Sequence, residues 1–264
     1  MEPLSLPRLA PHRNLAETVY GALKGAIIEN SLPAGYRLTE AAIAASMDVS
    51  NTPVREALSR LEREGLVSLV PRRGAVVASF TAEDLLAITE VREALETHAV
   101  RKAIARRPSA VEERLAAILE ECVPFVAVRD PRGFNRLDVE FHRLLVQASG
   151  NLHLQRAFEM LHDQVQVIRW QVFRIRGRPE MPHSEHEAIY AAFVAGDADE
   201  AERVLREHVR HAAVDLLNAL AAKGDPQAAR IAASYASSQG TYRQELRGGP
   251  PLTGKGYEPQ MNAD

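Results

Sequence analysis

The spacing of hydrophobic residues predicts helices over most of the chain. Near the N-terminus, hydrophobic residues recur every four positions, which places them on one helix face: Leu15, Val19, Leu23 and Ile27. A proline and a glycine at 33 and 35 end that helix. Thr39 is suited to cap a short second helix, and Thr52-Pro53 resembles a cap followed by proline in the first position of a third helix. The buried face of the third helix is expected to contain Val54, Ala57, Leu58 and Leu61.

Two segments of alternating hydrophobicity, residues 66–70 and 75–78, predict a pair of β-strands after the third helix. A basic tip, PRRG at 71–74, joins them. Helix-turn-helix followed by a basic hairpin is a winged helix, a fold that binds DNA. Polar and basic side chains at the start of the third helix and at the tip are suited to base edges and phosphates, so we expect DNA contacts from Ser50, Asn51, Thr52, Arg55, Arg72, Arg73 and Gly74.

From residue 81 to about 222, the chain predicts one helix after another, without strong β signals. Thr81-x-x-Asp84 is a helix start. Proline and glycine then break the pattern at 107–108, 130–131, 150–151, 177–179 and 196–197, which gives six helices. The predicted fold class is mainly α: an N-terminal winged helix-turn-helix followed by an all-α helical bundle.

The two ends of the chain differ in composition from the predicted domains. Residues 1–13 contain three prolines, and residues after 223 are rich in Gly, Pro, Gln and Ser. We therefore predict a flexible arm at 1–13, a DNA-binding domain at 14–79, a second, all-helical domain at 81–222, and a loose tail at 223–264.

Charge and cysteine content narrow the class of protein. The net charge of the 264 residues is −3, but residues 50–74 contain five Arg and three Glu, a local charge of +2. Affinity for DNA must therefore come from a local patch. Cys122 is the single cysteine, which excludes an intrachain disulfide and a cysteine-based zinc site. The chain has neither a signal-peptide pattern nor an apolar run of about 18 residues, so we expect a cytoplasmic protein that does not span a membrane.

Asp138 and His142 stand four residues apart, on one helix face that also carries Phe134, Phe141 and Leu145. Both polar groups are thus expected to point toward the core. A buried carboxylate is costly unless it is paired or bound to metal. The pair is either a simple hydrogen bond or half of a metal site.

Two further histidines, His186 and His208, share helix faces with apolar residues. Three imidazoles and one carboxylate would make an N₃O site for Zn²⁺, Mn²⁺ or Ni²⁺. Spacing alone leaves His183 and His211 open as alternatives, because they lie one turn away.

Arg92 lies on the apolar stripe of the first helix of the second domain. Such an arginine either extends its charged end to the surface, pairs with a glutamate, or holds a carboxylate ligand through two parallel hydrogen bonds. Arg143 and Arg169 are the next candidates to bind an acid.

The N-terminal motifs resemble the GntR family of bacterial regulators, specifically its FadR-like subfamily with a C-terminal, all-helical FCD ligand-binding domain. The resemblance rests on AGYRLTE at 34–40, on residues 49–67 and on Arg72-Arg73-Gly74. Two positions depart from the family pattern: Asp48 replaces a glycine, and Asn51 replaces an arginine that contacts bases. Asparagine is better suited to adenine than to guanine, so the operator is expected to differ from the family's usual half-site.

The resemblance extends through residue 222. The family's Asp-x-x-x-His appears at 138–142, and its His-x₁₀-Asp-x₁₀-His appears as His186, Asp197 and His208. The resemblance therefore implies Asp138, His142, His186 and His208 as metal ligands. It also implies that Arg92, in the VREALE segment 91–96, lines an effector pocket.

The expected function is ligand-controlled regulation of transcription, most simply repression relieved by an effector. The resemblance implies a homodimer on double-stranded, pseudo-palindromic operator DNA, and a small organic or sugar acid bound beside a divalent metal ion. No enzymatic activity is expected. One alternative is a metal-dependent hydrolase or lyase fused to a DNA-binding module. No obvious general base stands beside the cluster in the sequence, although Glu140 and Glu185 are close in number. The other alternative is a sensor for which metal itself is the effector.

Overall fold

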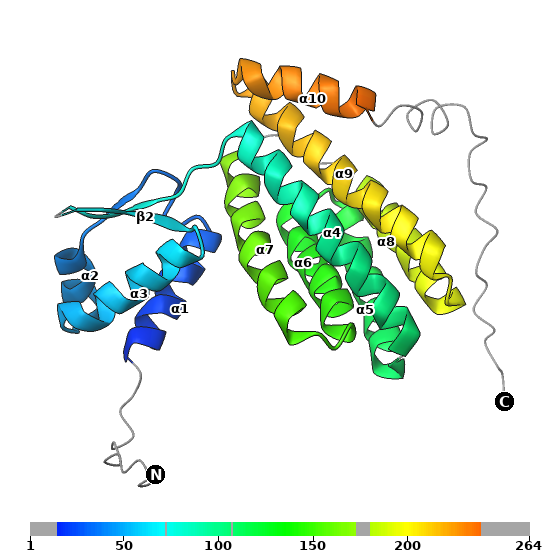
Figure 1. Ribbon diagram of the computed structural model, residues 1–264, viewed down its shortest axis with the longest axis horizontal. Coiled ribbons are helices and arrows are strands. Elements are labelled where there is room, and N and C mark those ends of the chain that lie inside the picture. Colours follow the sequence, from blue (N-terminus) through cyan, green and yellow to red (C-terminus); the bar gives the residue numbers. More distant parts are fainter. Residues whose placement is uncertain (1–14, 72, 107, 173–179, 239–264) are drawn as a thin grey trace, which may run out of the picture.

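The computed structural model describes residues 15–71, 73–106, 108–172 and 180–238, and it contains a small winged helix domain beside a larger helical domain (Figure 1). The predicted fold class is confirmed. The winged helix domain is built from α1 (Leu15–Ile28), β1 (Arg37–Leu38), α2 (Glu40–Met47), α3 (Asn51–Arg63), β2 (Val67–Val70) and β3 (Gly74–Val77).

The wing is a three-stranded antiparallel sheet with strand order β1-β3-β2. Val67 pairs with Val77, and Arg37 pairs with Val76 on the other side of β3. The sequence predicted β2 and β3 but missed β1, because a strand of two residues has no readable alternation. The hydrophobic face of α3 is buried as predicted, and Val54, Ala57, Leu58 and Leu61 pack against α1 and the sheet.

Helix caps set the geometry of the helix-turn-helix. Thr39 caps α2 as predicted, since its hydroxyl accepts a hydrogen bond from the amide of Ala42 at 3.2 Å. The prediction that Thr52 caps α3 was wrong, because the helix begins two residues earlier with Ser50 as its N-cap. Pro53 is tolerated there because the first amides of a helix have no intrahelical partner.

The described chain has six helices between residues 82 and 222. They are α4 (Ala82–Arg106), α5 (Ser109–Ala127), α6 (Pro131–Ala148), α7 (Leu152–Val172), α8 (Glu180–Ala195) and α9 (Ala198–Ala222). The predicted breaks at 130–131, 150–151 and 196–197 fall between helices, whereas residues 107 and 177–179 lie outside the described residues. Thr81 and Asp84 form a reciprocal capping pair at the start of α4, with hydrogen bonds of 2.7–3.1 Å.

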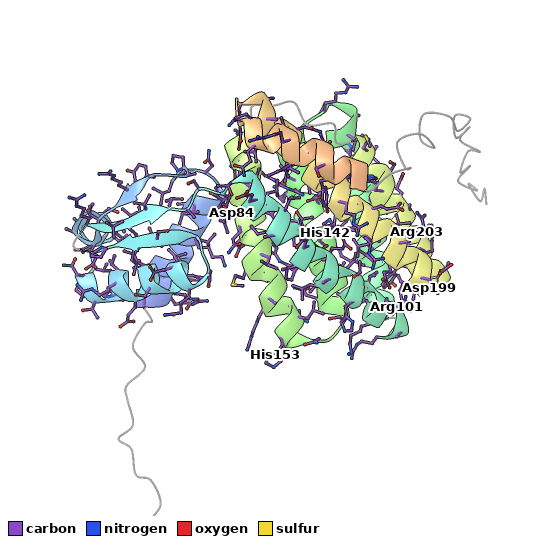
Figure 2. The ribbon with its side chains drawn as sticks, turned by 45° about the horizontal axis from the view of Figure 1, so that its top comes forward. Asp84, Arg101, His142, His153, Asp199 and Arg203 are labelled. Carbon is purple, nitrogen blue, oxygen red and sulfur yellow. The ribbon has the colours of Figure 1, made fainter. Side chains whose placement is uncertain are left out.

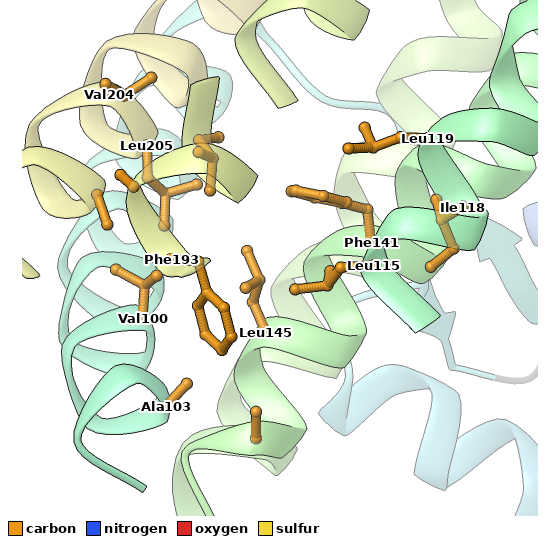
Figure 3. Packing of buried hydrophobic residues seen from close by; sticks show 14 of the residues in the cluster. Val100, Ala103, Leu115, Ile118, Leu119, Phe141, Leu145, Phe193, Val204 and Leu205 are labelled. Atoms are coloured by element: carbon orange, nitrogen blue, oxygen red, sulfur yellow. The ribbon is translucent and has the colours of Figure 1, made fainter. Parts of the chain in front are cut away.

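The main core of the helical domain lies where α4, α5, α6, α8 and α9 meet (Figure 3). Each helix contributes at least one fully buried side chain, among them Val100, Leu115, Phe141, Phe193 and Leu205. These five helices consequently hold one another at fixed spacing, and the polar residues on their inner faces are held with them.

The prediction of a loose tail from 223 was wrong for residues 226–238. Pro226–Ser238 form a helix, α10, that packs on α9 and α4 (Figure 1). Ala228 and Ala232 are buried in one hydrophobic cluster with Leu217 and Leu220 of α9. A helix with small apolar contacts carries little hydrophobic signal, so its composition resembled a linker. Residues 239–264, like the predicted arm at 1–13, lie outside the described residues.

Helix α7 connects the two domains, and Figure 1 shows it on the side of the bundle that faces α1 and α3. Val167 is part of the hydrophobic core of the winged helix domain. The Nζ of Lys24 lies 2.5 Å from Oδ2 of Asp163, and Gln164 donates a hydrogen bond to the backbone oxygen of Glu64 at 2.9 Å.

Candidate metal centre and DNA-binding surface

A cluster of three histidines and one aspartate lies inside the helical domain, where Figure 2 labels His142. Asp138 and His142 come from adjacent turns of α6, whereas α8 and α9 provide the other two members, His186 and His208. All four side chains are buried, with 0–2% of their surface exposed. One possible ligand atom from each residue lies within 4.8 Å of the others.

The distances in the cluster suit a small cation. The Nε2 of His208 lies 3.0 Å from Nε2 of His142 and 3.3 Å from Nε2 of His186. Oδ1 of Asp138 lies 3.9 Å and 3.6 Å from the same two nitrogens of His142 and His186. Ligands at about 2.0–2.1 Å from one ion are roughly 3 Å from each other. The arrangement therefore fits one divalent ion.

Two carboxylates orient the imidazoles from behind. Nδ1 of His142 lies 2.6 Å from Glu96 on α4, and Nδ1 of His208 lies 2.8 Å from Glu185 on α8. Each carboxylate accepts a hydrogen bond from Nδ1–H, so the Nε2 lone pairs of both neutral rings face the centre of the cluster. Lone pairs only 3.0 Å apart repel each other unless a cation lies between them. Carboxylate–histidine pairs of this kind are typical of metal sites.

The third imidazole is oriented by packing. His186 stacks on Phe141, with ring centroids 4.3 Å apart and an angle of 14° between the rings. Burial lowers the pKa of His186 well below its ordinary value, and the charge of His208 lowers it further. A neutral imidazole is the form that binds metal.

Asp138 is held as a carboxylate by Arg169 of α7. The NH1 group of Arg169 lies 2.6 Å from Oδ2 of Asp138, which leaves Oδ1 toward the histidines. Burial alone would raise the pKa of Asp138, but Arg169 and the neighbouring histidines lower it well below its ordinary value. The aspartate is therefore charged and available as a ligand.

The alternative histidines lie outside the cluster. His211 is hydrogen-bonded to Glu185 at 2.6 Å, and His183 lies 3.5 Å from the exposed Glu187. The geometry therefore favours the ligand set that the family resemblance implied.

The three candidate effector-binding arginines are in different environments. Arg92 is buried beside Glu96, 2.7 Å away, and Arg169 contacts Asp138. Both are thus bonded to groups of the cluster or its immediate surroundings. Arg143 pairs instead with Glu159 of α7 at 2.6 Å, and it lines a groove of about 450 Å³ between the two domains.

Five of the predicted DNA-binding residues are exposed in the winged helix domain: Ser50, Asn51, Thr52, Arg55 and Arg73. Ser50, Asn51 and Thr52 are exposed at the N-terminus of α3, and the side chain of Arg55 is 67% exposed. Arg55 forms a two-pronged ion pair with Glu40 of α2, at 2.8 and 3.2 Å.

At the tip of the wing, Arg73 is exposed, and Arg72 lies outside the described residues. Gly74 has a structural reason to be glycine: its φ is +90°, and a Cβ atom would lie 2.0 Å from the backbone oxygen of Leu38.

The sequence named Glu185 only as a possible general base, and it did not identify Glu96 or His162 as neighbours of the cluster. A signal existed for Glu96, which follows Arg92 by one turn, and for Glu185, which precedes His186. No helix in the described part of the chain is long and apolar enough to cross a membrane.

Comparison with known proteins places these features in two families. Residues 15–77 match the bacterial regulatory proteins of the gntR family, and residues 87–211, which include the whole cluster, match the FCD domain. The HTH-type transcriptional regulator YdhC of Bacillus subtilis (strain 168) is 32% identical over 197 residues, which cover 73% of this chain and 86% of that protein.

Two further relatives agree with these matches. The HTH-type transcriptional repressor RspR of Escherichia coli (strain K12) is 26% identical over 203 residues, covering 77% of this chain and 89% of RspR. The structure of E. coli McbR/YncC superposes with a TM-score of 0.70 at 22% identity, and the match covers 78% of this chain and 99% of that one. McbR/YncC therefore shares the fold of this chain.

Proposed function

Because the chain belongs to the GntR family of bacterial transcription regulators and carries an FCD domain, we propose that a small carboxylic acid controls its binding to operator DNA. The observation that carries this proposal is the buried cluster of Asp138, His142, His186 and His208. Four ligating side chains in a protein core cost stability compared with apolar ones, which points to a functional reason for their presence.

In this proposal, residues 14–79 bind DNA and residues 81–222 bind metal and effector. GntR regulators are generally dimeric. A homodimer would present two α3 helices to the half-sites of a double-stranded, pseudo-palindromic operator. Relief of repression by the effector is the proposed sign of regulation, and RspR, a relative, is named a repressor.

The exposed start of α3 is proposed to enter the major groove. Asn51 and Thr52 would contact base edges there, while Arg55 and the wing residues Arg72 and Arg73 would contact phosphates or guanine. The Arg55–Glu40 ion pair lies at an exposed site and is therefore weak, so the guanidinium can exchange its partner for DNA.

Substitution of single arginines, followed by measurement of operator affinity, tests this surface. Arg55→Ala is expected to weaken operator binding by about 1–3 kcal/mol. Arg101→Ala is the matched control, because Arg101 is also an exposed arginine in ion pairs but lies in the helical domain. The operator is first selected from a random DNA library, and affinities are measured by fluorescence anisotropy. Equal affinities of the two variants would refute the assignment.

The cluster is proposed to hold one divalent ion, Zn²⁺, Mn²⁺ or Ni²⁺, through Oδ1 of Asp138 and the Nε2 atoms of the histidines. A bound ion would supply a Lewis acid with which a carboxylate oxygen can associate. Around it, Glu96 and Glu185 orient the imidazoles, and Arg169 keeps Asp138 ionised.

Arg92 and Arg169 are proposed to attract the effector's carboxylate, because guanidinium groups bind carboxylates with two parallel hydrogen bonds. Arg92→Ala is expected to abolish the effect of the acid on operator affinity while operator binding without acid persists. Arg114→Ala, which removes an ion-paired arginine at the surface of the same domain, should respond like the wild type. Metal content is measured in both variants, because Arg92 also contacts Glu96. A normal response in Arg92→Ala would contradict its role.

The alternative functions predict different results in the same assays. The named relatives are transcription regulators, which argues against an enzyme. Both carboxylates considered as general bases have other partners: Glu140 pairs with Arg114, and Glu185 with His208 and His211. Consumption of an added acid would favour the enzyme. Loss of operator binding on addition of metal alone would favour a metal sensor.

A further inference from the structure

His162 is a buried histidine of α7 that is not part of the cluster. Its residue surface is 1% exposed, and its ring packs on Phe158 with ring centroids 5.1 Å apart. The positive charges of Arg92 and Arg169 act on this ring. His162 is thus held inside the domain, near the two arginines proposed to attract the effector.

A chain of hydrogen bonds fixes which nitrogen of His162 carries the proton. Arg169 can only donate, so the Asn135 atom that it contacts is the carbonyl oxygen. The amide nitrogen of Asn135 then donates to Oε1 of Gln166 at 2.9 Å. The amide nitrogen of Gln166 is left to donate to Nε2 of His162 at 3.1 Å. Nε2 of His162 is therefore an acceptor, and the proton of the neutral ring is on Nδ1.

This Nδ1–H group is a donor without an acceptor. It is buried, and within the part of the chain that the structure describes it has no hydrogen-bond partner. Burial lowers the pKa of His162 well below its ordinary value, and the charges of Arg92 and Arg169 lower it further, so the ring is neutral. Native proteins rarely leave a buried N–H group unpaired. The group therefore points to an acceptor that does not belong to the described protein.

We propose that Nδ1–H of His162 donates a hydrogen bond to an oxygen of the effector and selects acids that carry a second oxygen group. This rests on the proposed function, in which Arg92 and Arg169 attract the effector's carboxylate. A carboxylate alone can be satisfied by those arginines. A neutral N–H donor beside them adds a site for a hydroxyl, keto or second carboxylate oxygen, because a site with an unpaired donor discriminates against ligands that leave it unpaired.

The position of His162 on α7 connects the effector to the DNA-binding domain. The next two residues in the sequence are Asp163 and Gln164, which hold Lys24 and the backbone oxygen of Glu64 in the winged helix domain. A ligand that binds His162 and shifts its position would therefore also shift the segment of α7 that contacts the winged helix domain. Effector binding at this residue should therefore change operator affinity.

Matched pairs of acids test the proposal on full-length, metal-loaded protein. The probes are lactate against propionate and succinate against butyrate, which differ within each pair by one oxygen-bearing group. His162→Leu removes the donor, and His162→Asn retains an N–H group near the position of Nδ1. Binding is measured by isothermal titration calorimetry, and metal content and thermal stability are recorded to show that both variants are folded.

The wild type is expected to prefer at least one oxygen-rich acid over its partner. His162→Leu should lose about tenfold in affinity for that acid and retain its affinity for the partner, while His162→Asn recovers much of the loss. Unchanged discrimination in His162→Leu, or equal binding within both pairs by the wild type, would overturn the role of His162 and leave the carboxylate-binding function intact. If none of the four acids binds the wild type, both proposals fail.

Discussion

The orientation of each histidine in the cluster depends on a neighbouring side chain that is not a proposed ligand. Glu185, which contacts His208, allows the most direct test of this role. It contacts Nδ1 of His208 at 2.8 Å but does not belong to the proposed ligand set. Glu185→Gln is expected to weaken metal binding about 10- to 100-fold, because it removes the negative charge that orients and polarises the imidazole. Competition with a fluorescent zinc indicator measures the affinity. Glu187→Gln, on the exposed side of the same helix, is the control, and equal affinities of the two variants would count against the role of Glu185.

The same carboxylate should leave a signature in the acid unfolding of the metal-free protein. Burial by itself would raise the pKa of Glu185, but hydrogen bonds with His208 and His211 outweigh it and lower the pKa from 4.5 to about 2. The unfolded chain therefore takes up the proton first as the pH falls. The stability from this group is fully present above pH 4.5 and is lost as the pH falls toward 2.

Glu185→Gln should consequently lose less stability than the wild type between pH 5 and pH 3, a window set by those two pKa values. Urea unfolding at several pH values, with chelator present throughout, measures the difference. A stability difference between wild type and variant that does not change with pH would show that Glu185 titrates normally.

At the scale of the secondary-structure elements, α10 is the helix that the sequence analysis predicted as part of a loose tail. Its buried contacts come from alanines, among them Ala228 with 0% exposure. Ala228→Glu is expected to destabilise the protein by about 2–4 kcal/mol, because it places an unpaired charge against α9. Ala229→Glu, one position along and exposed, is the control and should change stability little. Thermal unfolding decides the matter: matching melting temperatures would mean that α10 does not pack on α9 in solution.

The success of the helix predictions elsewhere has a simple physical basis. α4 to α9 are long, and proline or glycine separates them, so their hydrophobic period and their breaks are both readable. β1 and α10 could not be predicted in the same way. β1 exists only because β3 pairs with it, and α10 only because α9 offers a surface for its alanines. Tertiary contacts therefore create both elements.

At the scale of the whole molecule, part of the candidate site could be predicted from the sequence, and part of it depends on tertiary contacts. Asp138 and His142 could be paired from sequence because they share a helix face. The register of His186 and His208 required the family resemblance, since His183 and His211 fit the spacing equally well. The contacts that Glu96 of α4 and Arg169 of α7 make with the cluster could not be predicted, because they arise only through the packing of the bundle.

Helix α7 gives the molecule a direct physical connection between its two domains. On one side of α7, Arg169 contacts Asp138 of the cluster, and Gln166 accepts a hydrogen bond from Asn135 of α6. Two other residues of α7, Asp163 and Gln164, are bonded to the winged helix domain. Because a helix is stiff over this distance, a change on one side of α7 is transmitted to the other. The proposed ligand control of DNA binding would therefore need no further connection between the domains.

The cluster also ties three helices of the bundle together, so removal of metal should destabilise the whole helical domain. An ion that binds only the folded state adds about 2.7 kcal/mol when its concentration is 100 times its dissociation constant. For a protein of this size, chelation is then expected to lower the melting temperature by roughly 5–10 °C. His186→Gln should melt at the same temperature with and without chelator, because one ligand is missing. His183→Gln should behave like the wild type, since His183 lies outside the cluster. Differential scanning calorimetry with added Zn²⁺, Mn²⁺ or Ni²⁺ measures these shifts. If the wild type melts identically with metal and with chelator, the four side chains form a hydrogen-bonded core and bind no ion.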